Sequence, residues 1–341
     1  MQFKLFVCLI CGLILILSCK TDIEILTEPP GESFLQKPDH FPEMPFPEGN
    51  EFTNERWEFG KMLFFDKRLS INNTISCATC HKQEFALADN TNFSDGVFGR
   101  AGTSNVPSLA NIGYNPYFLR GGSVPTLEQQ ILVPIQEHNE FNHDIVLLCN
   151  ELKLDTTYSK LAAENYDRIF DPFVLTRAIS AYQRTFISGN SPYDQHEFGQ
   201  ENVLNASQLR GKELFFNDQN ECGSCHSGFN FTNYNFENNG LYLTYDNPGR
   251  GSQTFNAIDS ATFKVPSLRN IDLTAPYMHD GSIATLEDVV EHYNLGGVAH
   301  PNKSSMVKPL GLNSQEKEDL VNFLKSLTDY EFVNDVRFRE E

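Results

Sequence analysis

One five-residue pattern occurs twice in the chain, as CATCH at residues 77–81 and as CGSCH at residues 222–226. Two cysteines three positions apart, with a histidine directly after them, have the spacing at which two thiols bond to the vinyl groups of a haem while the imidazole reaches the iron. A lone C-x-x-C could also be a redox dithiol or half of a zinc site, but the adjacent histidine suits neither, and the pattern recurs. The sequence therefore predicts two covalently bound haem c groups, held by Cys77, Cys80, His81, Cys222, Cys225 and His226.

The other four cysteines leave no pair for a structural disulfide. Cys8 and Cys11 lie in the first apolar run, Cys19 ends it, and Cys149 stands alone in an apolar stretch. A single cysteine in such a stretch is typical of a small buried hydrophobic residue rather than of a nucleophile.

The N-terminus has the layout of an export signal. In residues 1–18 one lysine precedes an apolar stretch that is too short for a comfortable membrane span. Ile16-Leu17-Ser18-Cys19 resembles a bacterial lipobox, so we expect a lipid on Cys19 and a periplasmic protein, anchored at the outer membrane as Lys20 favours. An ordinary signal peptide and an uncleaved anchor are the alternatives. The proline-rich remainder of residues 19–50 predicts an extended tether.

Composition limits the classes of partner. The formal net charge of -19 argues against binding nucleic acid or anionic lipid through charge, because both need a basic surface. A length of 341 residues is enough for two domains with cores of their own.

An internal repeat predicts how the haem motifs are positioned. GKMLFF at 60–65 returns as GKELFF at 211–216, VPSLANI at 106–112 as VPSLRNI at 265–271, and GSVPTLE at 122–128 as GSIATLE at 281–287. We therefore expect two related domains, residues 51–190 and 191–341.

Apolar periodicity indicates that these domains are built from helices. Residues 173–186 carry an amphipathic stripe, and Asn313 with Glu316 predicts a capped helix whose face continues through Leu320 and Leu327. The predicted fold class is mainly α, with two cytochrome c-like domains and long loops at 87–107 and 228–264.

The chain resembles the bacterial di-haem cytochrome c peroxidase family, which includes the MauG-type enzymes. The resemblance extends over about residues 55–330 and is most specific in FKVPSLRNIDLTAPYMHDGSIATLEDVVEHYN, residues 263–294. It implies that an N-terminal haem reacts with hydrogen peroxide. A C-terminal haem would accept electrons from a small donor protein, a cytochrome c or a cupredoxin.

The resemblance assigns roles around the first haem. Some relatives block its open face with a histidine at the position of Val97, and no histidine lies between His81 and Asn105, so we expect an open iron. Glu140 matches the family's acid–base glutamate, although Glu137, His138 and His143 are close in sequence.

For the second haem the position of the sixth ligand holds Tyr293, where the peroxidases have methionine and MauG has tyrosine. Met278, Met306 and His292 are rival ligands. A phenolate would favour ferric iron and lower the potential of this haem.

Two further positions concern the region between the haems. Arg120 falls at or beside the place of the family's inter-haem tryptophan. Asn105, Thr274 and Pro276 match residues that hold a calcium ion in relatives, and their oxygen donors suit that hard cation.

Together these features predict an exported di-haem peroxidase. A MauG-type oxidase of a protein or organic substrate and a non-catalytic di-haem electron carrier are the alternatives. A homodimer is compatible with the sequence.

Overall fold

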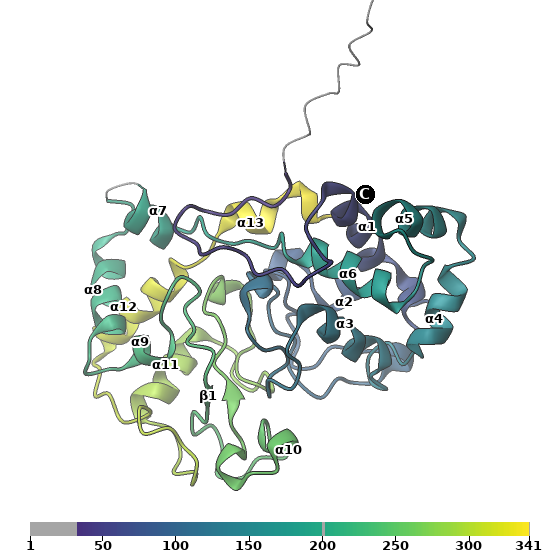
Figure 1. The fold of residues 1–341 in the computed structure, drawn as a ribbon. Coiled ribbons are helices and arrows are strands. Elements are labelled where there is room, and N and C mark those ends of the chain that lie inside the picture. The colour runs from purple at the N-terminus through teal and green to yellow at the C-terminus, as the bar shows by residue number, and fades with distance from the viewer. Residues whose placement is uncertain (1–32, 200–201, 341) are drawn as a thin grey trace, which may run out of the picture. The chain divides into compact units, whose positions relative to one another are not determined.

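Short helices joined by long loops make up the computed structural model, which describes residues 33–199 and 202–340 (Figure 1). In chain order the α-helices are α1 (Asn54–Phe65), α2 (Cys77–Cys80), α3 (Leu127–Gln136), α4 (Ile145–Leu152), α5 (Thr156–Tyr166), α6 (Pro172–Gln183), α7 (Pro192–Phe198), α8 (Ala206–Phe216), α9 (Cys222–Cys225), α10 (Gly251–Thr254), α11 (Leu286–Leu295), α12 (Ser314–Lys325) and α13 (Tyr330–Asn334). Within these ranges the one sheet pairs β1 (Phe236–Glu237) antiparallel with β2 (Phe263–Lys264). The mainly α fold class is confirmed.

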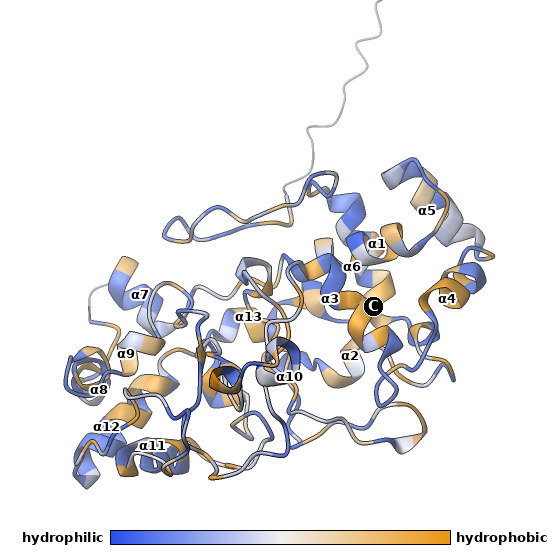
Figure 2. Ribbon diagram, turned by 60° about the horizontal axis from the view of Figure 1, so that its bottom comes forward, coloured by the Kyte–Doolittle hydropathy of each residue, from blue (hydrophilic) through white to orange (hydrophobic). Residues whose placement is uncertain are grey.

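Local sequence signals explain where the main helices begin. The Asn313 side chain accepts hydrogen bonds from the backbone N–H groups of Gln315 and Glu316, which completes the capping box predicted for α12. Asp171 caps α6 and Pro172 occupies its first turn, where the missing N–H costs nothing. Figure 2 shows hydrophobic and hydrophilic positions interspersed along α11 and α12, as amphipathic helices require.

Two helix pairs repeat the same packing around the two motifs. Helix α1 packs against α6, and α8 packs against α12 (Figure 1). A Cβ atom on Gly60 would lie 1.9 Å from the backbone oxygen of Ala178, and one on Gly211 would lie 1.9 Å from that of Asp319. Each pair therefore approaches so closely that only glycine fits, which gives the sequence repeat a structural meaning.

Equivalent asparagines join the two halves at the segment between them. Asn111 and Asn270 both adopt the left-handed conformation, with φ of 58° and 59°. The Asn111 side chain donates to the backbone oxygen of Ser188, and the Asn270 side chain donates to the Ser188 hydroxyl, both at 2.9 Å. Asp329 accepts from the backbone N–H groups of Gly189 and Asn190 at 2.9 Å. The connecting segment is thus fixed from both sides.

The cores do not follow the predicted boundary throughout. Phe332 and Phe338, near the C-terminus, are buried in the cluster that also contains Trp57 and Tyr182 of the first half. The Gln83 side chain supports this arrangement by donating to the backbone oxygen of Asp335 at 2.7 Å. Division at residues 190 and 191 stays a prediction, but residues 330–338 pack on the N-terminal core.

The tether prediction needs correction for residues 33–50, which form a loop with turns closed by hydrogen bonds from Phe41 to Pro38 and from Asn50 to Pro47, and which pack on the folded chain. Phe41 is buried in a small cluster with Met44 and Tyr114, and the Tyr114 hydroxyl donates to the backbone oxygen of Pro42 at 3.3 Å. The aromatic and methionine side chains between the prolines explain this packing, because their burial excludes apolar surface from water. Residues 1–32, with the predicted signal and Cys19, lie outside the described residues.

Two further features concern burial and surface. Cys149 is buried on α4, as predicted.

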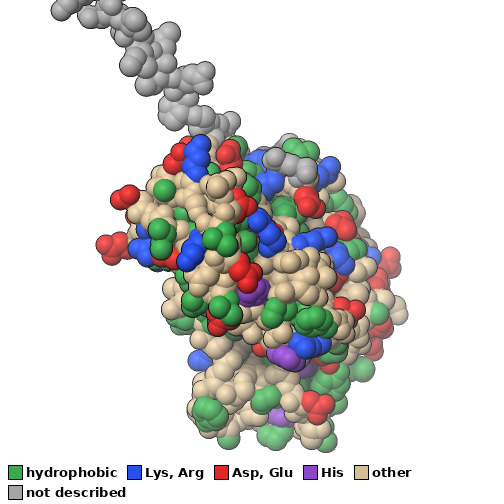
Figure 3. Space-filling view, turned by 90° about the vertical axis from the view of Figure 1, so that its right-hand side faces the viewer, with side chains coloured by type: hydrophobic (Ala, Val, Ile, Leu, Met, Phe, Trp, Pro, Cys, Tyr) green, Lys and Arg blue, Asp and Glu red, His purple; other side chains and the backbone are tan. Residues whose placement is uncertain are grey.

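No helix in the described ranges is both long and apolar enough to cross a membrane. On the face drawn in Figure 3, acidic and basic side chains are interspersed.

The glycine contacts predict matched effects in the two halves. Gly60→Ala and Gly211→Ala should each reduce the free energy of unfolding by about 2 kcal/mol or more, because the added methyl group meets a backbone oxygen. Thermal unfolding of the holoprotein should show this as a lower Tm. Glu58→Ala and Glu213→Ala change exposed positions on the same helices and serve as controls. Equal Tm values for a glycine variant and its control would contradict the close approach.

Candidate haem sites

Each motif forms a single helical turn, α2 or α9, and its histidine follows directly. His81 Nδ1 lies 2.7 Å from the backbone oxygen of Leu87, and His226 Nδ1 lies 3.1 Å from that of Phe231. A carbonyl oxygen can only accept, so Nδ1 carries the proton in both rings and the Nε2 lone pair is free for a metal. Burial also lowers the pKa of His226 to about 4 and that of His81 below its usual range, which keeps both imidazoles neutral.

Glu140 lies beside the first motif. It follows α3 in a turn whose backbone is fixed by the Val97 N–H, which donates to the backbone oxygen of Glu140 at 3.0 Å. Burial raises the pKa of Cys77 to about 12 and that of Cys80 to about 11. The charge of Glu140 adds to the upward shift at both thiols. The carboxyl is therefore close to both predicted attachment points.

The environment of Glu140 suits proton transfer. Glu140 is exposed by surface area, as Glu137 and His138 are, but protein atoms around its carboxyl displace water and raise the pKa of Glu140 to about 7, and the charge of Glu137 adds to this shift. A carboxyl with this pKa is present in both protonation states at neutral pH.

The neighbouring candidates lie elsewhere. Glu137 and His138 are exposed, and the backbone oxygen of His138 accepts from Arg100 at 2.9 Å. His143 is buried, with Nδ1 3.1 Å from the backbone oxygen of Asp144 and Nε2 3.6 Å from Glu151. Of the four groups considered from the sequence, only Glu140 is found to act on the motif cysteines.

Val97 is fully buried in the loop that holds the Glu140 turn. His40, in the segment before this half, stacks on Phe198 with ring centroids 4.0 Å apart. Together with the partners of His138 and His143, this means that each of these three described histidines is engaged away from the first motif.

A cavity of about 360 Å³ lies beside the second motif. Its lining includes Cys222, Cys225 and His226, together with the residues that the sequence offered as sixth ligands, Tyr293, Met278 and Met306. His292 is not part of this lining, and its Nε2 lies 3.0 Å from the backbone oxygen of Asn239. His292 thus has a backbone partner outside this lining, whereas the other three candidates face the cavity.

The three remaining candidates differ in their contacts. Met306 Sδ lies 3.9 Å from Cys225 Sγ, and Met278 Sδ accepts from the Asn239 amide at 3.2 Å. Burial raises the pKa of Tyr293 to about 12, while the side chain of Asn239 opposes the shift and the thiols of the motif add to it. Tyr293 is therefore a neutral phenol near both thiols, and it would lose its proton on binding a ferric ion.

Comparison with known proteins agrees with this arrangement. The family described as di-haem cytochrome c peroxidase matches residues 54–202, and cytochrome c matches residues 208–328. The chain is 34% identical to the methylamine utilization protein MauG of Methylorubrum extorquens, over 83% of this chain and 81% of that protein. The chain belongs to the di-haem cytochrome c peroxidase and MauG family.

Other members give similar values. The cytochrome c551 peroxidase of Nitrosomonas europaea is 34% identical over 80% of this chain and 79% of its own. A solved structure titled as a MauG-like protein associated with microbial copper homeostasis is 33% identical, with a TM-score of 0.84, over 89% of this chain and 97% of that one. The two cytochrome c-type domains are thereby confirmed, and family membership makes two covalent haem c groups the cofactors and the chain an oxidoreductase.

The second cavity fits such a cofactor in its charge as well. Arg120 and Lys264 both line it, and burial lowers the pKa of Arg120 to about 10 and that of Lys264 to about 8. The Nε atom of Arg120 is buried without a partner among the described residues. Haem carries two carboxylates, and buried cations of this kind suit such groups. The sequence did not indicate Lys264. It is an isolated lysine directly before VPSLRNI, and no charge pattern around it marks it as functional.

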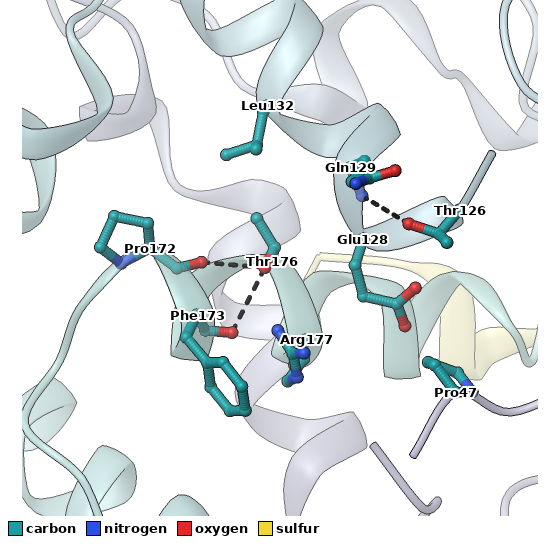
Figure 4. Close-up of a pocket in the computed structure, with 9 residues that line it drawn as sticks. All are labelled: Pro47, Thr126, Glu128, Gln129, Leu132, Pro172, Phe173, Thr176 and Arg177. Carbon is teal, nitrogen blue, oxygen red and sulfur yellow. Dashed lines mark hydrogen bonds between the residues drawn. The ribbon is translucent and has the colours of Figure 1, made fainter. Parts of the chain in front are cut away.

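A separate surface cavity of about 430 Å³ lies between α3 and α6 and is lined by Pro47, Glu128 and Arg177 among others (Figure 4). No residue of either motif lines it. Glu128 accepts from Arg184 at 2.7 Å and from Ser180 at 2.9 Å, so its charge is compensated within the fold.

Substitution of the three candidates tests which of them is the sixth ligand of the second haem. Tyr293→Phe should change the optical and electron paramagnetic resonance spectra of this haem and raise its reduction potential, because the ligand that favours ferric iron is removed. Met306→Leu and Met278→Leu should leave the spectra as in the unsubstituted protein. An unchanged spectrum in Tyr293→Phe, with a changed one in either methionine variant, would transfer the role to that methionine.

Proposed function

We propose that this chain is an exported peroxidase that reduces hydrogen peroxide to two molecules of water with two electrons and two protons. The observation that carries the proposal is the position of Glu140, whose pKa is about 7, beside a motif whose histidine is fixed for metal binding. When bound, the haems supply a redox-active iron for peroxide and a second iron that passes on electrons.

In this proposal His81 is the only protein ligand of the first iron. Val97 replaces the histidine with which some relatives block the other face, and the other histidines of this half have partners elsewhere. Peroxide could then reach the iron without a prior movement of this loop.

Glu140 would transfer the proton on which O–O cleavage depends. Its carboxylate accepts a proton from one peroxide oxygen and returns it to the other, so that the second oxygen leaves as water. The accessible part of the side chain allows exchange with solvent, while its near-neutral pKa makes both transfers feasible at neutral pH.

Electrons would enter through the second haem, with His226 and Tyr293 as its ligands. A small cytochrome c or cupredoxin is the donor class implied by the family. The proposal places the enzyme in the periplasm, anchored by a lipid on Cys19, and a homodimer stays a prediction.

A MauG-type oxidation of a protein or organic substrate is the second candidate. The position of Tyr293 in the second cavity and the 34% identity to MauG favour it. Arg120 weighs against it, because a guanidinium near the place of the inter-haem tryptophan cannot share oxidising equivalents as an indole can.

Electron paramagnetic resonance separates an enzyme from an electron carrier. The ferric protein should show one high-spin haem, open to peroxide, and one low-spin haem, and peroxide should change the high-spin signal. Two low-spin signals with no reaction would contradict the proposal.

Substitution of Glu140 tests its role directly. Glu140→Gln should reduce peroxide turnover about 10²- to 10⁴-fold with both haem spectra intact, because the amide cannot transfer the proton. In the unsubstituted enzyme kcat/KM should rise with pH through about 7, since the deprotonated carboxylate must accept first. The variant should lose this dependence. Glu137→Gln, an exposed neighbour, is the matched control; equal turnover in the two variants would exclude the assigned role.

A further inference from the structure

We propose that the Arg120 guanidinium takes the place between the two halves that the family gives to a calcium ion, so that this chain needs no calcium there. The inference does not depend on peroxidase activity. It starts from Asn105, which the resemblance had made a calcium ligand together with Thr274 and Pro276.

The oxygen atoms of Asn105 already have a cationic partner. Arg120 Nη2 donates to the backbone oxygen of Asn105 at 2.5 Å and to its side-chain oxygen at 3.3 Å. The remaining polar groups are engaged as well, because the Asn105 side-chain amide donates to Thr91 and its backbone N–H donates to His279, at 3.1 and 3.0 Å. Asn105 is thus fully satisfied without a metal ion.

Arg120 is itself attached to the other half of the molecule. Its backbone oxygen accepts from the N–H of Lys264 at 2.8 Å, and the Lys264 ammonium donates to the backbone oxygen of Tyr117 at 2.9 Å. Since Asn105 also bonds to His279, the Arg120 loop and the Asn105 loop both contact C-terminal segments. A covalently attached cation therefore links the same elements that an interdomain ion would link.

The charges around this place disfavour a divalent ion. Arg120 and Lys264 line the cavity that Asn105, Thr274 and Pro276 also line, so calcium would lie close to two positive groups. Calcium prefers six to eight oxygen ligands, usually with carboxylates among them. The nearby carboxylate of Asp280 accepts from the Tyr242 hydroxyl at 2.7 Å and from the N–H of Ser282 at 3.1 Å.

No cluster of metal-binding side chains in the described residues offsets the positive charge of Arg120 and Lys264 at this place. Over residues 33–199 and 202–340, no three His, Cys, Asp or Glu side chains gather as they would around a metal ion. Thr274 and Pro276 could offer only backbone oxygens or a hydroxyl beside a fixed positive charge. Because Arg120 already occupies both oxygens of Asn105, the place fits a guanidinium better than calcium.

The calcium content of the purified holoprotein tests this first. After dialysis against buffer with 1 mM calcium chloride and removal of free ion, elemental analysis should find less than about 0.1 calcium per chain, because the oxygen ligands are already engaged. The chelator EGTA should leave both haem spectra and the Tm unchanged. About one calcium per chain, lost to EGTA with a change in either haem spectrum, would overturn the proposal.

Two substitutions at Arg120 distinguish its charge from its size. Arg120→Gln keeps a donor for Asn105 but removes the charge, and it should take up about one calcium per chain with a Tm that rises when calcium is added. Arg120→Lys keeps the charge and should exclude calcium as the unsubstituted protein does.

Each variant has its own outcome that would contradict the proposal. Calcium uptake by Arg120→Lys equal to that by Arg120→Gln would show that charge is not the cause, and absence of uptake by a folded Arg120→Gln would show that the place is no ion site. Should Arg120→Gln not fold, the calcium content of the unsubstituted protein and of Arg120→Lys still decides the question.

Discussion

The hydrogen bond from each motif histidine to a backbone oxygen is the constraint on which both haem sites depend. An imidazole can bind iron only through a nitrogen that carries no proton, and the bond from Nδ1 to Leu87 or Phe231 leaves Nε2 in that state. The loop after each motif must therefore return to its own histidine. The helix pairs behind the motifs support this geometry, since the contacts at Gly60 and Gly211 fix the separation of the helices on which the motifs rest.

The two sites share this histidine geometry but differ in the residues that each half brings near its motif. The first half holds the Glu140 turn near the motif through backbone hydrogen bonds from Val97 to Glu140 and from Ile71 to Phe141. The second half instead offers a cavity with Tyr293, Met278 and Met306, each able to donate to iron. One duplicated unit can thus serve two tasks, because changes in loop residues alter access and ligation while the helices stay the same.

The sequence predicted the features that depend on local chemistry. The repeated motifs, the capping box at Asn313 and the helix near residues 173–186 follow from spacing and residue type, and the structure has both helices. Long-range packing was missed. Residues 33–50 form a small cluster with Tyr114, the C-terminal phenylalanines pack in the first core, and neither contact has a local signature, because an apolar side chain does not indicate which surface it will bury. The Arg120 contact with Asn105 was missed for the same reason.

Arg120 also affects how Tyr293 should be understood. A phenolate ligand stabilises ferric iron, which would make the second haem a poorer electron acceptor. Arg120 and Lys264 act in the opposite direction, because reduction lowers the positive charge at the iron, and nearby cations favour the less positive state. With both influences at one cavity, an electron-accepting haem can keep a tyrosine ligand without an extremely low potential. The cation that joins the two halves would then also tune the haem through which electrons enter.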